Sequence, residues 1–189
     1  MSFFSPEHDK TLGLRWLAII LLFIASTFMD YSWQRMFHMV FGFAWWSLLF
    51  FLAVILIPII NNLKEDTVAD FVGIVVPRVF RTVSIVGFMA VMEGLFLLDQ
   101  ITKHFQELSY MTRDGWSIAF TISTLLTTGI YLFHLFLEKN EIKVAMKIAE
   151  GKLTMKDEEV VNFLKNLKRT PRVGFILITF TVVAMIIKI

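Results

Sequence analysis

Cysteine is absent from this chain of 189 residues. Disulfide bonds, thiolate nucleophiles and cysteine-based zinc or iron–sulfur sites are therefore excluded. Charged residues are also scarce, since they make up 18% of the chain against about 25% in a typical soluble domain. The formal net charge of +2 is too small to indicate nucleic-acid binding. No glycine-rich phosphate loop, HExxH sequence or pair of catalytic carboxylates occurs, so nothing points to a catalytic activity of this chain's own.

Hydrophobic residues make up 57% of the chain and gather in long runs. Five of these runs are long enough to cross a hydrocarbon core, which takes about 20 helical residues. We interpret the first run as a retained span and not as a cleaved secretory signal. The prediction is an all-α membrane protein with a single integral membrane domain, residues 1–189, surrounded by membrane lipids. The predicted spans are 12–29, 37–60, 79–98, 116–137 and 172–189.

Lysine and arginine are distributed unevenly between the two sides of this bundle. Of the 18 basic residues, 14 lie in or beside the N-terminal tail, the 61–78 loop and the 138–171 loop, and 4 lie on the other side. Short cytoplasmic loops carry an excess of Lys and Arg. The sequence therefore predicts a multi-pass protein of the cell membrane with its N-terminus in the cytoplasm and its C-terminus outside.

The two predicted cytoplasmic loops carry helical patterns of their own. Residues 68–75 have apolar residues at helical spacing, which predicts a short interfacial helix before Pro77 opens the third span. Residues 138–150 and 155–168 read as two amphipathic helices broken at Gly151. This hairpin, 138–168, either lies on the membrane with its basic residues against anionic lipid or serves as a docking surface for a partner protein.

Small and hydroxylated residues form stripes on two spans. Such stripes let helices approach closely in lipid and share interhelical hydrogen bonds. We expect them to be packing seams and not a serine catalytic site. The stripes are Ser84, Gly87, Ala90 and Gly94 on the third span, and Ser117, Thr121, Thr124 and Thr128 on the fourth.

His38 stands at the outer end of the second span, flanked by Met36 and Met39. Imidazole together with thioether suits copper, especially Cu(I). Three residues so close in sequence cannot all converge on one ion if the segment is helical, so Glu93 and His104 are candidates to complete a metal site. The alternatives are an interfacial histidine without a ligand and a residue that carries protons.

Glu93 lies inside the third span, where a carboxylate is costly by a few kcal/mol at the bilayer centre. It is either a functional group or a neutral carboxyl hydrogen-bonded across the bundle.

A bis-histidine haem needs two histidines at one depth, and only His38 and His104 qualify. His104 lies beyond its span, which argues against haem b. His134 lies near the inner end of the fourth span, about 27 Å from that span's outer start, and cannot share a ligand with His38.

The run FHMVFGFAWWSLLFFLAVILIPII, residues 37–60, resembles the CopD-like integral membrane proteins associated with copper resistance. That family has a span with a histidine near its start, a tryptophan about two turns later and a proline near its end. The next span opens as VPRVFR, which is also similar. The resemblance implies copper handling at or across the membrane, with His38 as the carried-over residue. The matching positions in the first run are His38, Trp45 or Trp46, and Pro58.

Three functional hypotheses follow. The leading one is a membrane protein that binds or transports copper at the outer face. The second is an accessory subunit of a larger membrane-bound oxidoreductase, such as a respiratory or copper-dependent oxygenase complex, which needs no site of its own. The third is a haem or quinone electron carrier that uses His38, His104 and Glu93.

Overall fold

The computed structural model describes residues 17, 20–26, 28–103 and 106–187. All secondary structure in these ranges is helical, so the predicted all-α class is confirmed. Residues 20–26 form a helical segment that precedes α2. The remaining elements are α2 (Tyr31–Phe50), the π-helix η1 (Phe51–Leu56), α3 (Ile57–Asn61), α4 (Glu65–Ile101), the 3-10 helix η2 (Leu108–Thr112), α5 (Gly115–Ala149) and α6 (Glu158–Ile187). Residues 12–16, 18, 19 and 27 of the first predicted span lie outside the described residues, and so does His104.

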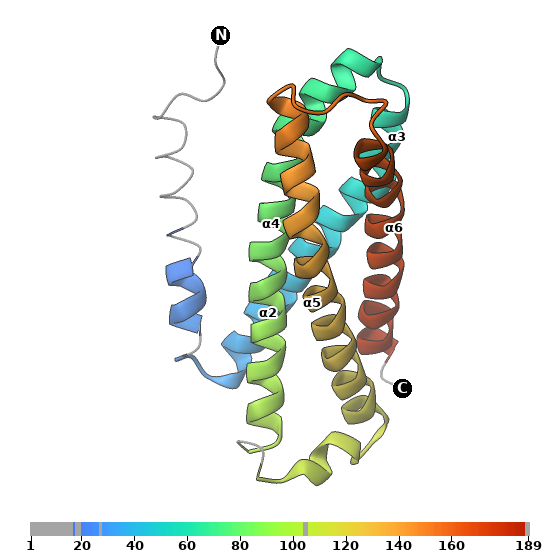
Figure 1. The fold of residues 1–189 in the computed structure, drawn as a ribbon. Coiled ribbons are helices and arrows are strands. Elements are labelled where there is room, and N and C mark those ends of the chain that lie inside the picture. Colours follow the sequence, from blue (N-terminus) through green and yellow to red (C-terminus); the bar gives the residue numbers. More distant parts are fainter. Residues whose placement is uncertain (1–16, 18–19, 27, 104–105, 188–189) are drawn as a thin grey trace.

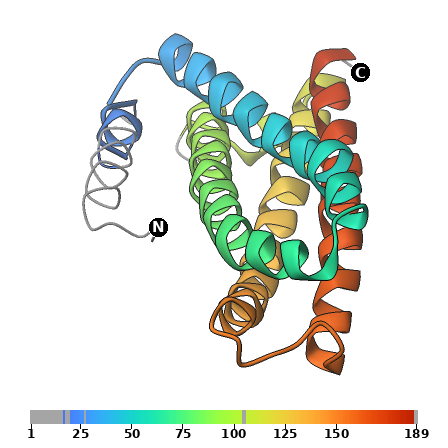
Figure 2. The ribbon, with the colours of Figure 1, turned by 90° about the horizontal axis from the view of Figure 1, so that it is seen from above.

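The long helices form a bundle in which successive helices run in opposite directions (Figure 1). In that view α4, α5 and α6 lie in front, and α2 crosses diagonally behind them. Seen from above, α2 again lies across one side of the bundle (Figure 2). We call the end that holds the α3–α4 and α5–α6 connections the upper end. The end that holds η2 and the start of α2 is the lower end.

Three helical stretches in the described part of the chain are long and apolar enough to cross a membrane: Tyr31–Ile60, Thr67–Ile101 and Gly115–Ala149. A helix of 35 residues is about 52 Å long, whereas a hydrocarbon core is about 30 Å thick. The long helices therefore extend well beyond the thickness of the core.

The predicted interfacial helices are not separate elements. Residues 68–75 belong to α4, which continues through Pro77. The predicted hairpin 138–168 consists of the end of α5 and the beginning of α6, and α6 continues through Pro171. The prediction of a separate short helix before Pro77 was therefore wrong, and the two amphipathic helices of the hairpin are continuous with the long helices and not elements of their own. The break at Gly151 is confirmed, since Gly151 has a φ of +68°, which favours glycine.

Packing at the upper end explains this difference. The apolar faces that the sequence assigned to the membrane surface pack against each other, and Val72, Ala145 and Val160 are completely buried. Each internal proline removes one helical hydrogen bond. Burial of each large apolar side chain contributes about 1.5–3 kcal/mol, which offsets that loss.

The π-helical segment has a local cause in Pro58. Proline has no N–H, and its ring clashes with the carbonyl four residues earlier. The helix widens just before this residue, and the Ile57 N–H binds the carbonyl of Leu52, five residues back. Such π-bulges are frequent at functional sites. Here the bulge places Leu52 beside the cavity described below.

The small residues predicted to form a seam on α4 do so. A Cβ at Gly87 would lie 2.9 Å from Cε2 of Trp45 and 3.1 Å from Cδ2 of Tyr131. The absence of a side chain there lets both rings reach α4. Trp46, the next residue, donates a hydrogen bond from Nε1 to Oγ1 of Thr179 at 2.9 Å, which joins α2 to α6.

Candidate functional site

His38 packs closely on α4. Its Nδ1 lies 3.2 Å from the carbonyl oxygen of Ala90. A carbonyl only accepts hydrogen bonds, so Nδ1 carries the proton and Nε2 of the neutral ring keeps a lone pair. The ring Cε1 lies 3.1 Å from where a Cβ of Gly94 would stand, and the edge of the ring faces Phe120.

Met36 and Met39 are not brought together with His38. The side chains of Met36 and Met39 are 37% and 55% exposed. The His38 side chain is less exposed, because it is half-buried and faces α4. Successive helical positions are rotated by about 100°, so the two thioethers lie on the outward face of α2. This agrees with the expectation that the three residues diverge on a helix.

Glu93 is completely buried on α4 and contacts the helical segment 20–26. The hydroxyl of Ser26 donates a hydrogen bond to Oε1 of Glu93. Oε2 has no hydrogen-bond partner. The carboxyl is thus hydrogen-bonded across the bundle, as one of the two sequence interpretations expected.

These placements decide how well the residues fit a copper ion. In the part of the chain that the structure describes, no group of three His, Cys, Asp or Glu side chains is placed to hold a metal. The thioethers of Met36 and Met39 face away from His38. The described residues therefore do not form a copper ligand set, and we derive no step through copper.

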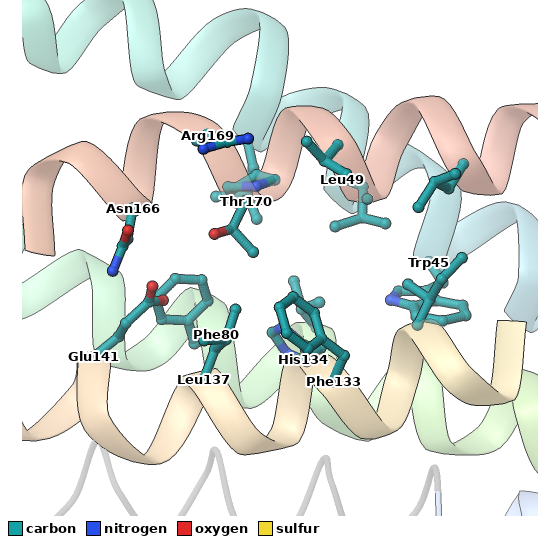
Figure 3. Close-up of a pocket in the computed structure, with 17 residues that line it drawn as sticks. Trp45, Leu49, Phe80, Phe133, His134, Leu137, Glu141, Asn166, Arg169 and Thr170 are labelled. Carbon is teal, nitrogen blue, oxygen red and sulfur yellow. The ribbon is translucent and has the colours of Figure 1, made fainter.

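A cavity of about 410 Å³ lies between α2, α4, α5 and α6, toward the upper end (Figure 3). Most of its wall is aliphatic or aromatic, with Leu49, Phe80 and Leu177 as examples. Polar side chains concentrate where α5 meets the first half of α6. The polar or titratable residues that line the cavity are Trp45, His134, Glu141, Asn166, Arg169 and Thr170.

Two buried polar atoms beside this cavity have no hydrogen-bond partner. These are Nε1 of Trp45 and Oε1 of Glu141, and their side chains are only 3% and 6% exposed. Trp45 packs edge-on against Tyr131 with 6.1 Å between ring centroids. Tyr131 precedes Glu141 by ten residues on α5, which corresponds to about 15 Å. The cavity is therefore elongated and has an unsatisfied polar group toward each end.

A chain of hydrogen bonds leads away from the middle of the cavity. Oγ of Ser84 lies 2.9 Å from Nε2 of His134, and the Ser84 hydroxyl donates to Oε2 of Glu138. His134 also lines the cavity and is held edge-on by Phe80 at a centroid distance of 5.9 Å. Glu138 is half-buried, one turn nearer the upper end.

Sequence reasoning placed His134 and Ser84 on separate spans and did not connect them. A signal was present, because His134, Glu138 and Glu141 recur at i, i+4 and i+7 and so share one face of α5. Three titratable side chains on one face of a mostly apolar helix indicate that the face is turned toward other protein groups and not toward lipid.

Comparison with protein-family models, curated proteins and solved structures found no match for this chain. The resemblance to CopD-like proteins is therefore neither supported nor contradicted by these comparisons.

Proposed function

We propose that the protein is a multi-pass membrane protein that binds a single-chain amphiphile inside its helical bundle. The observation that carries this proposal is the mostly apolar cavity with the unpartnered Oε1 of Glu141 in its upper part. A buried polar group without a partner costs about 1–3 kcal/mol. A ligand head group beside Glu141 removes that cost there, and the apolar walls suit its hydrocarbon chain.

The size and polarity of the cavity support this class of ligand. Its volume of about 410 Å³ falls in the range of small-molecule sites, about 300–1,000 Å³. The head group is expected at the upper part, where Asn166, Arg169 and Thr170 line the wall. The chain then extends along Leu49 and Leu177 toward the lower end.

We propose in addition that the bundle crosses the membrane five times, with the N-terminus and the upper end in the cytoplasm. The uneven distribution of Lys and Arg supports this orientation, and the exposed aromatic side chains of Phe43, Phe133 and Phe180 suit contact with lipid. Because the chain has no cysteine, single-cysteine variants test the topology directly. Lys152→Cys should react with a membrane-impermeant maleimide only after the cells are opened, and Arg113→Cys should react in intact cells. The reverse pattern would overturn the orientation.

The ligand proposal is tested by photo-crosslinking in native membranes, since a detergent is itself a single-chain amphiphile. The probe is palmitate with a photoreactive diazirine in its chain, and labelled peptides are identified by mass spectrometry. Gly174 lines the cavity, and a Cβ there would meet no atom within 4 Å. Gly174→Leu should therefore fill the cavity without distorting the helix.

Gly129→Leu is the matched control, because a Cβ at Gly129 also meets nothing within 4 Å and this residue does not line the cavity. We expect labelling of peptides from α5 and α6 beside the cavity, its loss in Gly174→Leu and its retention in Gly129→Leu. Equal labelling in both variants, or labelling confined to lipid-facing side chains, would refute the proposal.

Copper handling is a second candidate, and one observation favours it. A metal-binding histidine usually donates its other ring N–H to a carboxylate or a backbone carbonyl, as His38 does to Ala90. The companion ligands must come from outside the described residues, with His104 as the candidate in this chain. Elemental analysis of the protein from its native membrane should then give stoichiometric copper that His38→Ala removes. Unchanged copper in that variant would refute the role of His38.

The same preparation tests the other two predictions from the sequence. An accessory subunit of an oxidoreductase should comigrate with a constant set of larger proteins in mild detergent. A haem carrier should absorb in the Soret region, and a featureless visible spectrum would remove that hypothesis.

A further inference from the structure

We propose that the amphiphile is a long-chain carboxylate and that it binds together with one proton, which enters along Glu138, Ser84 and His134. This inference rests on the proposed function and adds the chemical class of the head group and its coupling to protons.

The donors around the upper part of the cavity favour a carboxylate head group. Figure 3 shows the Thr170 side chain above the space between Glu141 and His134. Asn166 lies beside Glu141. A hydroxyl and an amide both donate hydrogen bonds, and a carboxylate only accepts them. Arg169 also borders the cavity, but it is exposed and its side chain extends away from Glu141 and His134.

The charge of such a ligand needs compensation in this position. Burying an ionised carboxylate in an apolar site is expensive unless it is paired, and Glu141 is a second carboxyl beside it. Two carboxyl groups that share a site are both ionised at low cost only if a positive charge lies beside them. Protonation of His134 supplies a positive charge where the ligand lies, because the ring lines the cavity.

The observed hydrogen bonds form a path for that proton. Glu138 is half-buried and takes up a proton from water at the upper end. Its O–H passes this proton to Oγ of Ser84, while the Ser84 hydroxyl passes its own proton to Nε2 of His134, which already carries a proton on Nδ1. The result is an imidazolium beside the head group, a restored serine hydroxyl and a carboxylate at Glu138. That final state has the donor pattern of the structure, in which Ser84 donates to Glu138 and lies 2.9 Å from His134.

Other charged and titratable groups lie near the hydrogen bonds that join Glu138, Ser84 and His134, and none of them replaces a partner in these bonds. They are Tyr131 and Glu141 on α5, Arg81 on α4, one turn before Ser84, and Arg169 on α6, and the cavity residues from α2 carry no charge. Within the described ranges, no Lys or Arg nitrogen lies within 4 Å of the Glu138 carboxylate. No cation within that distance therefore competes with Ser84 for the Glu138 carboxylate.

The test is competition against the diazirine palmitate probe in native membranes between about pH 6 and about pH 8. The competitors are palmitate and hexadecanol, which have the same chain length and differ in the head group. Because the partition of palmitate into lipid itself depends on pH, the readout is the affinity of each variant relative to wild type at each pH. One coupled proton changes the affinity by up to about tenfold per pH unit.

We expect palmitate to bind more tightly to wild type as the pH falls, and this advantage to disappear in Ser84→Ala. Ser84→Thr keeps a hydroxyl and should keep the pH dependence. Glu138→Gln removes the carboxyl group at the start of the same path. Because Glu138 is only half-buried, this variant is the second test if Ser84→Ala does not fold. Hexadecanol should compete weakly at every pH.

The outcomes separate the two proposals. No labelling of the cavity refutes the proposed function. Labelling with the same pH dependence in wild type, Ser84→Ala and Glu138→Gln refutes the proton path and leaves the cavity proposal standing. Competition by hexadecanol as strong as by palmitate refutes the carboxylate head group.

Discussion

Gly73 lies at a close contact between α4 and α5, and its replacement by alanine gives a quantitative test of the packing at the upper end. A Cβ at Gly73 would lie 2.5 Å from Cβ, 3.0 Å from Cα and 3.3 Å from N of Ala149. Carbon atoms in contact are normally about 3.5–4.0 Å apart. The two helices would therefore have to separate by about 1–1.5 Å, and none of the three contacting atoms belongs to a flexible side chain.

The expected effect is a net loss of stability. Overpacking a close contact costs about 1–3 kcal/mol, whereas a Gly→Ala exchange inside a helix gains about 0.5–1 kcal/mol. Gly73→Ala should therefore destabilise the fold by about 1–2 kcal/mol. The assay is unfolding in mixed micelles with increasing sodium dodecyl sulfate, followed by circular dichroism.

Gly42→Ala and Gly129→Ala are the controls. A Cβ at either position meets no atom within 4 Å, so both variants should gain about 0.5–1 kcal/mol. Ala149→Gly in the Gly73→Ala background should restore most of the loss, because it removes the Cβ that clashes. A Gly73→Ala variant as stable as the two controls would show that α4 and α5 do not meet as described.

Two further variants test the buried carboxyl of Glu93 and the helix-capping carboxyl of Asp114. Glu93→Gln should fold with stability close to wild type, because an amide oxygen can accept the Ser26 hydrogen bond; loss of the folded bundle in the same micelle assay would show that an ionised Glu93 is structurally required. Asp114 caps α5, and the Ser117 backbone N–H, at 2.7 Å, lowers the pKa of its carboxyl below the ordinary 3.8. Its stabilising contribution is thus fully present above that ordinary value and is lost as the pH falls through the lower value in the folded state. Asp114→Asn still caps the helix, so its thermal unfolding temperature should fall less than that of wild type below about pH 4, and equal acid sensitivity of the two proteins would contradict this assignment.

The amino-acid sequence by itself determined the helical class, the long apolar stretches and the break at Gly151. These features depend on local properties: the length of an apolar run, helical spacing and the backbone freedom of glycine. The divergence of Met36, His38 and Met39 was predictable for the same reason, since it follows from helix geometry alone.

Tertiary structure decided where the helices begin and what lies between them. Helices α4 and α6 continue through Pro77 and Pro171 because the end of α5 buries their apolar faces, and a run of residues does not say what will cover it. The cavity and the proton path depend on which faces of distant helices meet. Ser84 is 50 residues from His134 in sequence, and Trp45 reaches the cavity only because Gly87 leaves room for its ring. Such contacts arise from packing between helices, whose partners and rotation the periodicity of a single helix does not specify.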